Sequence, residues 1–335
     1  MACSQPAPTN TWYGEHITVT SAEGITPCAG TIPFLDSYIL HAHRFWGSMP
    51  NLAPFELELR QQTSDSEHGG LAASGTAWAT ADRSVLHEIN HLVTHSEDGY
   101  SAPSLTEGIA TALAPTDPFS MWGSTARSPE DFAFLERTEF GSEHYDDSAQ
   151  LTRFLIQRYG VSQFRKAYQQ ARLDSSAEEI EEAYLSAFGD GIYDAFDEFD
   201  QAPTCGLRAW ECERKLHPSM ALPVNLNSPT DCSKDPTWIG ANSSDDENWY
   251  PHRRFLVEFS KTTRIVALSE NARVIRMTCD DECGFPPETP FPVEDVARTA
   301  GSESTPSTVN AGLHSFHISP IDPNLPFSVD IKQLE

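Results

Sequence analysis

The spacing of the apolar residues changes once along this chain of 335 residues, close to residue 200. Between residues 146 and 191 they recur at helical spacing. After residue 203, short β-rich runs such as Phe255–Phe259 and Val274–Met277 are separated by Pro, Gly, Asn and Asp. The first pattern is typical of amphipathic helices and the second of an antiparallel β-sandwich. We therefore predict an α+β protein with two domains.

Residues 1–28 are rich in Pro, Thr and Ser, which predicts a flexible leader. The first domain then covers residues 29–203, and the β-sandwich covers residues 204–335. Within the first domain the pattern predicts a helix over Thr31–Trp46, strands over Phe55–Leu59 and Thr76–Thr80, a helix from Arg83 to His95 capped by Asp82, and a helix that begins at a Ser175–Glu178 capping box.

The chain is strongly acidic, with 49 acidic and 22 basic residues and a formal net charge of −27. Such a surface repels phosphate groups and anionic lipid headgroups, so we expect neither nucleic acid nor a membrane surface as a partner. No run approaches the ~18 apolar residues that a transmembrane helix needs. We therefore expect no transmembrane segment.

The seven cysteines and 24 prolines are typical of an extracytoplasmic protein, although the first residues show no signal peptide. Cys3 follows a small residue and precedes a Ser- and Pro-rich stretch, as at the start of a mature bacterial lipoprotein. We predict a secreted or surface-tethered protein with a possible lipid anchor at Cys3; the alternative is a disordered tail with an incidental cysteine. The other six cysteines allow three disulfides in fifteen connectivities, which the sequence does not distinguish.

The motif with the most specific chemistry is His87-Glu-Ile-Asn-His91, which fits H-E-x-x-H. Residues four apart differ by only ~40° around a helix, so both imidazoles can bind one ion from the same face. Glu88 lies ~60° further round and can reach a water molecule on that ion. Zinc lowers the pKa of such a water to about 7, and a carboxylate can take its proton during attack on a carbonyl. The motif predicts a zinc site with Glu88 as general base.

A catalytic zinc usually takes a third protein ligand. His95 lies ~80° round and ~12 Å along the helix from the first histidine, so we expect it to be solvated or to support a ligand rather than to bind the ion. The metzincin pattern requires Gly and His where this chain has Thr94 and Glu97. The remaining candidate is Glu107, because a turn before Pro103 would return a second helix beside the first, with Glu107 in its first turn.

These motifs resemble those of the gluzincin metallopeptidases, in which H-E-x-x-H is followed by E-G-x-A on a second helix. The second motif here is Glu107-Gly-Ile-Ala110, and fifteen residues separate it from His91. The chain also looks like secreted gluzincin-like proteins of bacteria in the order of its segments. Cys28-Ala-Gly-Thr is followed by a helix, a strand, a Gly-containing loop and the H-E-x-x-H helix. The resemblance covers residues 28–200 and implies a zincin-like catalytic domain.

The resemblance also implies roles for individual residues. His87, His91 and Glu107 would be the zinc ligands and Glu88 the general base. The segment that begins at Tyr145 resembles the Y-x-x-A-G-x-F-x-x-F-L helix of that clan, with Ser-Ala in place of Ala-Gly and Leu in place of the first Phe. Tyr145 would then point its hydroxyl at the developing oxyanion. The adjacent His144 is an alternative donor.

The expected function is therefore that of a secreted or surface-tethered zinc metallopeptidase, with Zn²⁺ as cofactor and a peptide or protein as substrate. The alternative is a catalytically inactive zincin-like binding or adhesion module that presents the β-sandwich to a partner, because a fold does not by itself imply a function. Hydrolytic activity separates the two hypotheses.

Overall fold

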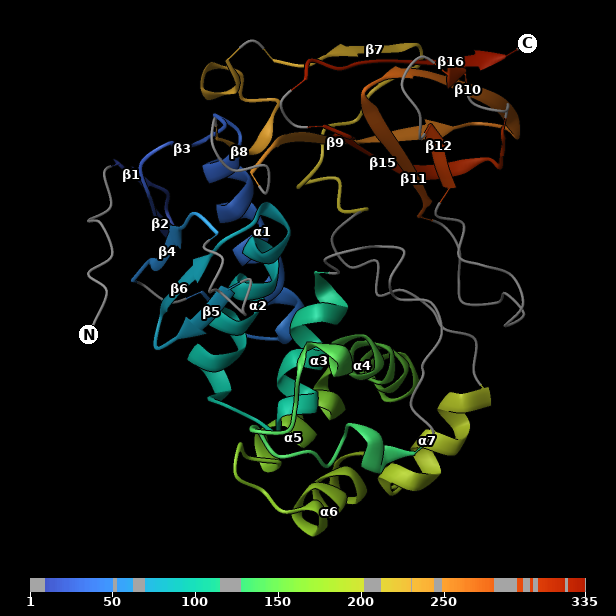
Figure 1. Ribbon diagram of the computed structural model, residues 1–335. Helices are drawn as coiled ribbons and strands as arrows, with labels where there is room; N and C mark the ends of the chain where they lie inside the picture. Colours follow the sequence, from blue (N-terminus) through green and yellow to red (C-terminus); the bar gives the residue numbers. More distant parts are fainter. Residues whose placement is uncertain are drawn as a thin grey trace.

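The computed structural model describes residues 10–50, 53–62, 70–114, 128–201, 212–229, 231–243, 249–279, 294–297, 302–303, 307–322 and 325–334. Within these ranges it contains seven α-helices and three sheets, which confirms the prediction of a mixed α+β protein. The helices are α1 (Thr31–Trp46), α2 (Asp82–Asp98), α3 (Pro103–Leu113), α4 (Tyr145–Tyr159), α5 (Val161–Gln170), α6 (Ala177–Phe188) and α7 (Ile192–Gln201). Helices α3 to α7 lie at the lower end of the molecule in Figure 1.

The first half of the chain contains a five-stranded mixed sheet in the order β1–β2–β4–β6–β5. Its strands are β1 (Asn10–Tyr13), β2 (Ile17–Ser21), β4 (Phe55–Leu59), β5 (Gly70–Ala73) and β6 (Thr76–Ala79). Strands β2, β4 and β6 are parallel, whereas β1 and β5 run antiparallel to their neighbours. Because β5 is last in the strand order, it forms one edge of the sheet.

Alternating apolar and polar residues give this sheet an apolar face. In β4 the side chains of Leu57 and Leu59 are buried, while Glu56 between Phe55 and Leu57 is exposed. The buried side chains belong to the same hydrophobic cluster as residues of α1 and α2, Ile89 among them. Packing against this face fixes α2, which carries the H-E-x-x-H motif, relative to the sheet.

The second half contains two antiparallel sheets, which lie at the upper end of Figure 1. One has the order β13–β10–β16–β7, with β14 also pairing with β10, and the other has the order β12–β11–β15–β9–β8–β3. Their strands are β3 (Ile25–Pro27), β7 (Val224–Asn227), β8 (Ile239–Ser243), β9 (Pro251–Phe259), β10 (Thr263–Glu270), β11 (Ala272–Thr278), β12 (Glu294–Ala297), β13 (Ser302–Glu303), β14 (Ser307–Val309), β15 (Gly312–Pro320) and β16 (Ser328–Leu334).

Side chains from both sheets share one hydrophobic core. Phe255 and Phe316 of one sheet stack with their ring centroids 5.4 Å apart, and Val329 and Ile331 of the other sheet belong to the same cluster. The second half is therefore sandwich-like, as its strand pattern predicted. The predicted domain boundary at residue 203 lies outside the described residues.

The prediction of a flexible leader over residues 1–28 is wrong for residues 10–28, and residues 1–9 lie outside the described ranges. Strands β1, β2 and β3 occupy this segment, and Ile17, Val19 and Ile25 are fully buried. Alternation over Ile17–Ser21 is a strand signal that the Pro- and Thr-rich composition obscured. Because β3 pairs with β8, this segment also joins the two halves of the molecule.

Two disulfides are described, Cys28–Cys232 and Cys212–Cys279. Disulfides are typical of extracytoplasmic proteins, which agrees with the predicted location. Cys3, Cys205 and Cys283 lie outside the described residues, so the lipid anchor stays a prediction. Among the helices that the structure describes, none is long and apolar enough to cross a membrane.

Several predicted helix ends differ from the structure by a few residues. Helix α2 begins at Asp82 after an N-cap at Ala81, and it continues three residues beyond His95. The capping box lies at Ser176 and Glu179, one residue later than predicted. Either serine could begin the helix by pattern, and the glutamate that reaches back to the N-cap decides between them. Helix α7 was not predicted.

Candidate metal and catalytic site

The predicted return of a second helix beside the H-E-x-x-H helix is what the structure shows. Helix α2 ends at Asp98 and is followed by Gly99, whose positive φ of 76° suits glycine. Helix α3 begins at Pro103, and the backbone N–H that proline lacks would have no partner at this first helical position. The Tyr168 hydroxyl donates a 3.1 Å hydrogen bond to the Gly99 carbonyl, which fastens the turn to α5. Glu107 is the fifth residue of α3, so it lies in the second turn rather than the first.

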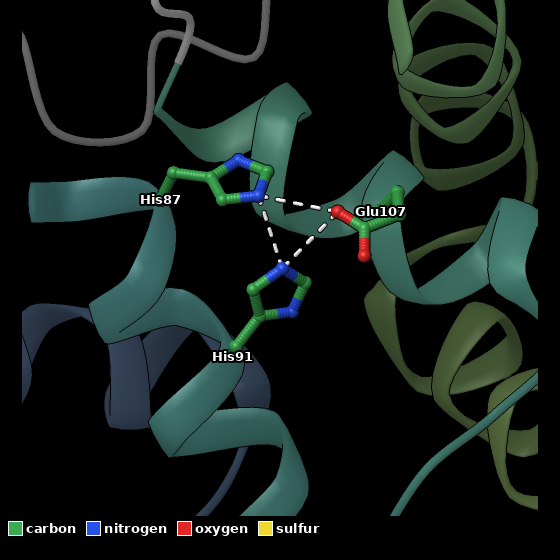
Figure 2. Close-up of side chains that lie close together, drawn as sticks. All are labelled: His87, His91 and Glu107. Carbon is green, nitrogen blue, oxygen red and sulfur yellow. Dashed lines mark hydrogen bonds and ion pairs between the residues drawn. The ribbon is translucent and has the colours of Figure 1, made fainter. Parts of the chain in front are cut away.

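Three side chains from these two helices meet at one point (Figure 2). Oε2 of Glu107 lies 3.2 Å from Nε2 of His87 and 3.2 Å from Nε2 of His91, and the two Nε2 atoms lie 3.0 Å apart. Ligand atoms about 2.0–2.1 Å from a tetrahedral zinc ion lie about 3.3–3.4 Å from one another. Two imidazoles and a carboxylate at this spacing therefore fit a zinc ion.

The electrostatics of this cluster favour a positive charge between the side chains. Burial raises the pKa of Glu107, but His91 and His87 outweigh it and hold that pKa well below its usual value, so the group is a carboxylate at neutral pH. Burial lowers the pKa of His91, but the charge of Glu107, its hydrogen bond and the charge of Glu88 together raise it. A cation that binds here meets two carboxylates in a buried setting.

Two further polar residues orient the cluster and were not found from the sequence. Oγ1 of Thr111 lies 3.4 Å from Nδ1 of His87, which leaves Nε2 facing the other ligand atoms. Asn90 is buried; it accepts a hydrogen bond from the Tyr38 hydroxyl at 2.9 Å and donates one to the Ala110 carbonyl at 3.1 Å. Asn90 thus ties α2 to both α1 and α3. The signal in the sequence was that a polar residue, Asn90, stands between positions of the motif that are buried.

The glycine of the E-G-x-A motif sets the position of α3 against α4. A Cβ added at Gly108 would lie 2.4 Å from Oγ1 of Thr152 and 2.8 Å from the carbonyl oxygen of Ser148. These distances are too short for any larger residue, so glycine allows the two helices to approach closely. This packing holds Glu107, the preceding residue, in place.

Glu88 faces a cavity of about 350 Å³, which is lined by the three clustered side chains, β5 and Tyr145. The side chain is only 4% exposed. A Cβ added at Gly70 of β5 would lie 2.3 Å from Oε1 of Glu88, so the edge strand passes directly over this carboxylate. Gly70 is a further residue that sequence reasoning missed, because the contact joins segments far apart in the chain.

The two candidate donors near the start of α4 differ in position. Tyr145 lines the cavity, and its ring stacks on that of His87 with a centroid distance of 5.8 Å and an angle of 6°. Burial, followed by the charges of Glu107 and Glu88, raises the pKa of the Tyr145 hydroxyl well above its usual value of 10. His144 instead packs on Phe140, with ring centroids 5.4 Å apart, and is not among the described lining residues.

His95 lies outside the cluster of ligand atoms, as predicted. Its ring stacks on His91 at 5.1 Å and contacts Tyr100 at 4.0 Å. Burial, with a contribution from His91, lowers the pKa of His95 to about 3, so this ring is neutral at pH 7. It supports His91 from one side and forms part of the cavity wall.

Comparisons with known proteins identify no family for this chain. No protein-family model matches the sequence, and the search of curated proteins finds no match. Among solved structures, a pre-peptidase C-terminal domain of a collagenase from Bacillus anthracis aligns with 35% of this chain and 92% of its own. The identity is 7% and the TM-score 0.22, which does not establish a shared fold.

Proposed function

We propose that this chain is a zinc-dependent peptidase whose first half is a gluzincin-like catalytic domain. The observation that carries the proposal is the convergence of three ligand atoms, 3.0–3.2 Å apart, in the wall of a cavity that also contains Glu88. The first sheet also supports the proposal. Its antiparallel edge strand β5 lies beside α2 and passes over Glu88. His87, His91 and Glu107 would hold the zinc ion.

When bound, zinc polarises a carbonyl and lowers the pKa of a water molecule to about 7. Glu88 then acts as the base: its carboxylate takes a proton from the attacking water and later gives it to the leaving amine. Its position under β5 shields it from bulk solvent. The same side chain therefore serves both proton transfers of peptide hydrolysis.

Tyr145 is the donor that we assign to the developing oxyanion. The phenol, whose pKa is raised further above neutral pH, keeps its proton and can donate a hydrogen bond to the carbonyl oxygen as negative charge builds there. Stacking on His87 holds the ring beside the cluster. His144 is turned toward Phe140 and Glu143 instead, with 3.6 Å between Nε2 and the Glu143 carboxylate.

The first experiment is elemental analysis of the purified protein. We expect about one zinc per chain in the wild type and in Glu88→Gln, and almost none in Glu107→Ala. Hydrolysis of a peptide library should fall about 10²- to 10⁴-fold in Glu88→Gln. Glu88→Gln protein that cleaves like the wild type would refute the assignment. Stoichiometric zinc without cleavage of any peptide would favour the inactive binding module.

We also propose that the protein is secreted or surface-tethered, which the two disulfides support. Mass spectrometry of the N-terminal peptide from the native source tests the lipid anchor at Cys3. A peptide of unmodified mass would leave secretion without an anchor.

A further inference from the structure

The segment before α4 forms part of the cavity wall through Arg137 and Phe140, and buried residues near its start anchor it. Phe132 and Ala133 are completely buried, and the Ser104 hydroxyl of α3 donates a 3.1 Å hydrogen bond to the Ala133 carbonyl. Further along, the ring of Phe140 stacks on Tyr145 with a centroid distance of 6.0 Å. Both ends of this segment are therefore held in place beside α3 and Tyr145.

Arg137 lies at the corner of a tight turn in this wall. The turn is closed by hydrogen bonds from the backbone N–H groups of Glu139 and Phe140 to the Glu136 carbonyl, at 2.9 and 3.0 Å. Arg137 lines the cavity together with the cluster and Glu88. It is the residue of this turn that brings a permanent positive charge to the cavity.

Arg137 differs from three other arginines of the first half, which are held by carboxylates. Residues 1–200 hold 30 acidic and 10 basic residues, so carboxylates are abundant near any cation. Arg60, Arg158 and Arg165 each form an ion pair with one. Among the residues that the structure describes, Arg137 forms no such pair, although Glu136 and Glu139 are its close neighbours in the chain. Arg137 therefore lines the cavity without a carboxylate partner among the described residues.

Two exposed apolar side chains also line the cavity. Leu71 of β5 is 50% exposed and Tyr100 is 36% exposed, and both line the cavity. Exposed apolar groups that meet in a concave site are typical of ligand-binding surfaces. Among the described lining residues, the cavity thus combines apolar side chains with one guanidinium, which is a fork of donors suited to a carboxylate.

We propose, on the basis of the proposed function, that Arg137 selects substrates that carry a carboxylate next to an apolar residue near the scissile bond. The carboxylate belongs either to an Asp or Glu side chain or to a free C-terminus. Arg137 binds it through paired N–H donors, and Leu71 and Tyr100 contact the apolar neighbour.

Three pools of random hexapeptides test the proposal. The first contains one Asp or Glu per peptide and is C-terminally amidated, the second has Asn or Gln instead and is amidated, and the third has Asn or Gln with a free C-terminus. Cleavage by the zinc-loaded protein is measured for wild type, Arg137→Ala and Arg137→Lys. The control is Arg44→Ala, an exposed arginine of α1 that does not line the cavity.

Binding of the same pools to Glu88→Gln protein, by fluorescence polarisation, gives a second readout that does not depend on turnover. We expect about tenfold tighter binding and lower KM for the first or third pool than for the second, according to the source of the carboxylate. Arg137→Ala should remove the preference, Arg137→Lys should keep part of it, and Arg44→Ala should keep all of it.

The proposal is overturned if wild type shows no preference, or if Arg137→Ala weakens all three pools equally. The two proposals fail separately. If the wild type cleaves nothing, the peptidase assignment fails, while the binding assay still decides whether Arg137 recognises carboxylates.

Discussion

The two halves of the molecule each contain a pair of histidines in almost the same arrangement. The rings of His87 and His91 are 4.6 Å apart at 84°, and those of His252 and His317 in the sandwich are 5.1 Å apart at 74°. In the first pair the histidines share the carboxylate of Glu107. Ring geometry alone does not distinguish the two pairs.

The neighbouring charges do distinguish them. Burial, followed by the charges of Arg254, His252 and Arg273, holds the pKa of His317 well below its usual value. A cation is therefore disfavoured there, whereas Glu107 favours one in the first half. Among the described residues, only the first pair belongs to a group of three converging ligand atoms. A carboxylate or a guanidinium beside paired histidines therefore decides whether they can hold a metal ion.

The largest expected effect comes from changing one histidine in each pair. His91→Gln should lower zinc affinity at least ~100-fold, because a ligand is lost, whereas His317→Gln should leave about one zinc per chain. Competition with a chelator measures both affinities on folded protein. Equal loss of zinc in the two variants would mean that the comparison is mistaken.

A smaller effect is expected when Glu88 is displaced without a change in metal binding. In Gly70→Ala the new Cβ would collide with Oε1 and the side chain of Glu88, so this side chain must move. We expect kcat to fall about 10- to 100-fold, with zinc content unchanged. The control is Gly75→Ala at the turn between β5 and β6, where no atom lies within 4 Å but φ is +85°. It should lower stability without lowering kcat; a matching loss of kcat would contradict the role of Gly70.

Helix packing gives the next effect, because Gly108, the neighbour of Glu107 in α3, lies where α3 contacts α4. Gly108→Ala places a Cβ against Thr152 and a backbone carbonyl, and we expect a loss of about 1–3 kcal/mol in the free energy of unfolding. Urea denaturation measures it. Adding Thr152→Ala should recover part of the loss, and an unchanged midpoint in Gly108→Ala would show that the helices can separate freely.

The smallest effect concerns Asp98, which fastens the end of α2 to α1 and α5. Its carboxylate accepts hydrogen bonds from Trp46 at 2.7 Å, from Arg165 at 2.6 Å and from Gln169 at 2.6 Å. Burial raises the pKa of Asp98, but these hydrogen bonds outweigh it and lower the pKa below its ordinary value of 3.8.

A lowered pKa in the folded state means that the charged carboxylate stabilises the protein above the pKa of the unfolded chain, and that this stability is lost as the pH falls through the folded-state pKa. Asp98→Asn should therefore lower the free energy of unfolding by about 1 kcal/mol at pH 7 and by less near pH 3. The control is Glu198→Gln, which removes an exposed pair with Arg158 and should change little. A pH-independent difference would contradict the charge argument.

The parts of the site that the sequence could predict are those that depend on local geometry. His87 and His91 share a face because they are four residues apart on one helix, and Glu107 follows after a short turn marked by glycine and proline. Their convergence needed only helix geometry and a return of the chain. Thr31–Trp46 and Phe55–Leu59 were predicted with correct bounds for the same reason.

The features that were missed depend on contacts between distant segments. Gly70 lies over Glu88, and Arg137 reaches the cavity from a turn that precedes α4. Neither is marked by a local pattern. The pairing of β3 with β8 and the connectivity of the cysteines were equally out of reach, because spacing alone does not say which partners meet.

The pairing of β3 with β8 has a consequence for the order in which the protein is built. Ile25–Pro27 is made early, but its partner Ala241 follows more than 200 residues later. At about 5–20 residues per second, a ribosome needs roughly 10–40 s to supply it. During this time β3 has no β8 to pair with, and Cys28 has no Cys232 with which to form a disulfide. The first half therefore completes its connection to the rest of the fold only after much of the second half has been synthesised.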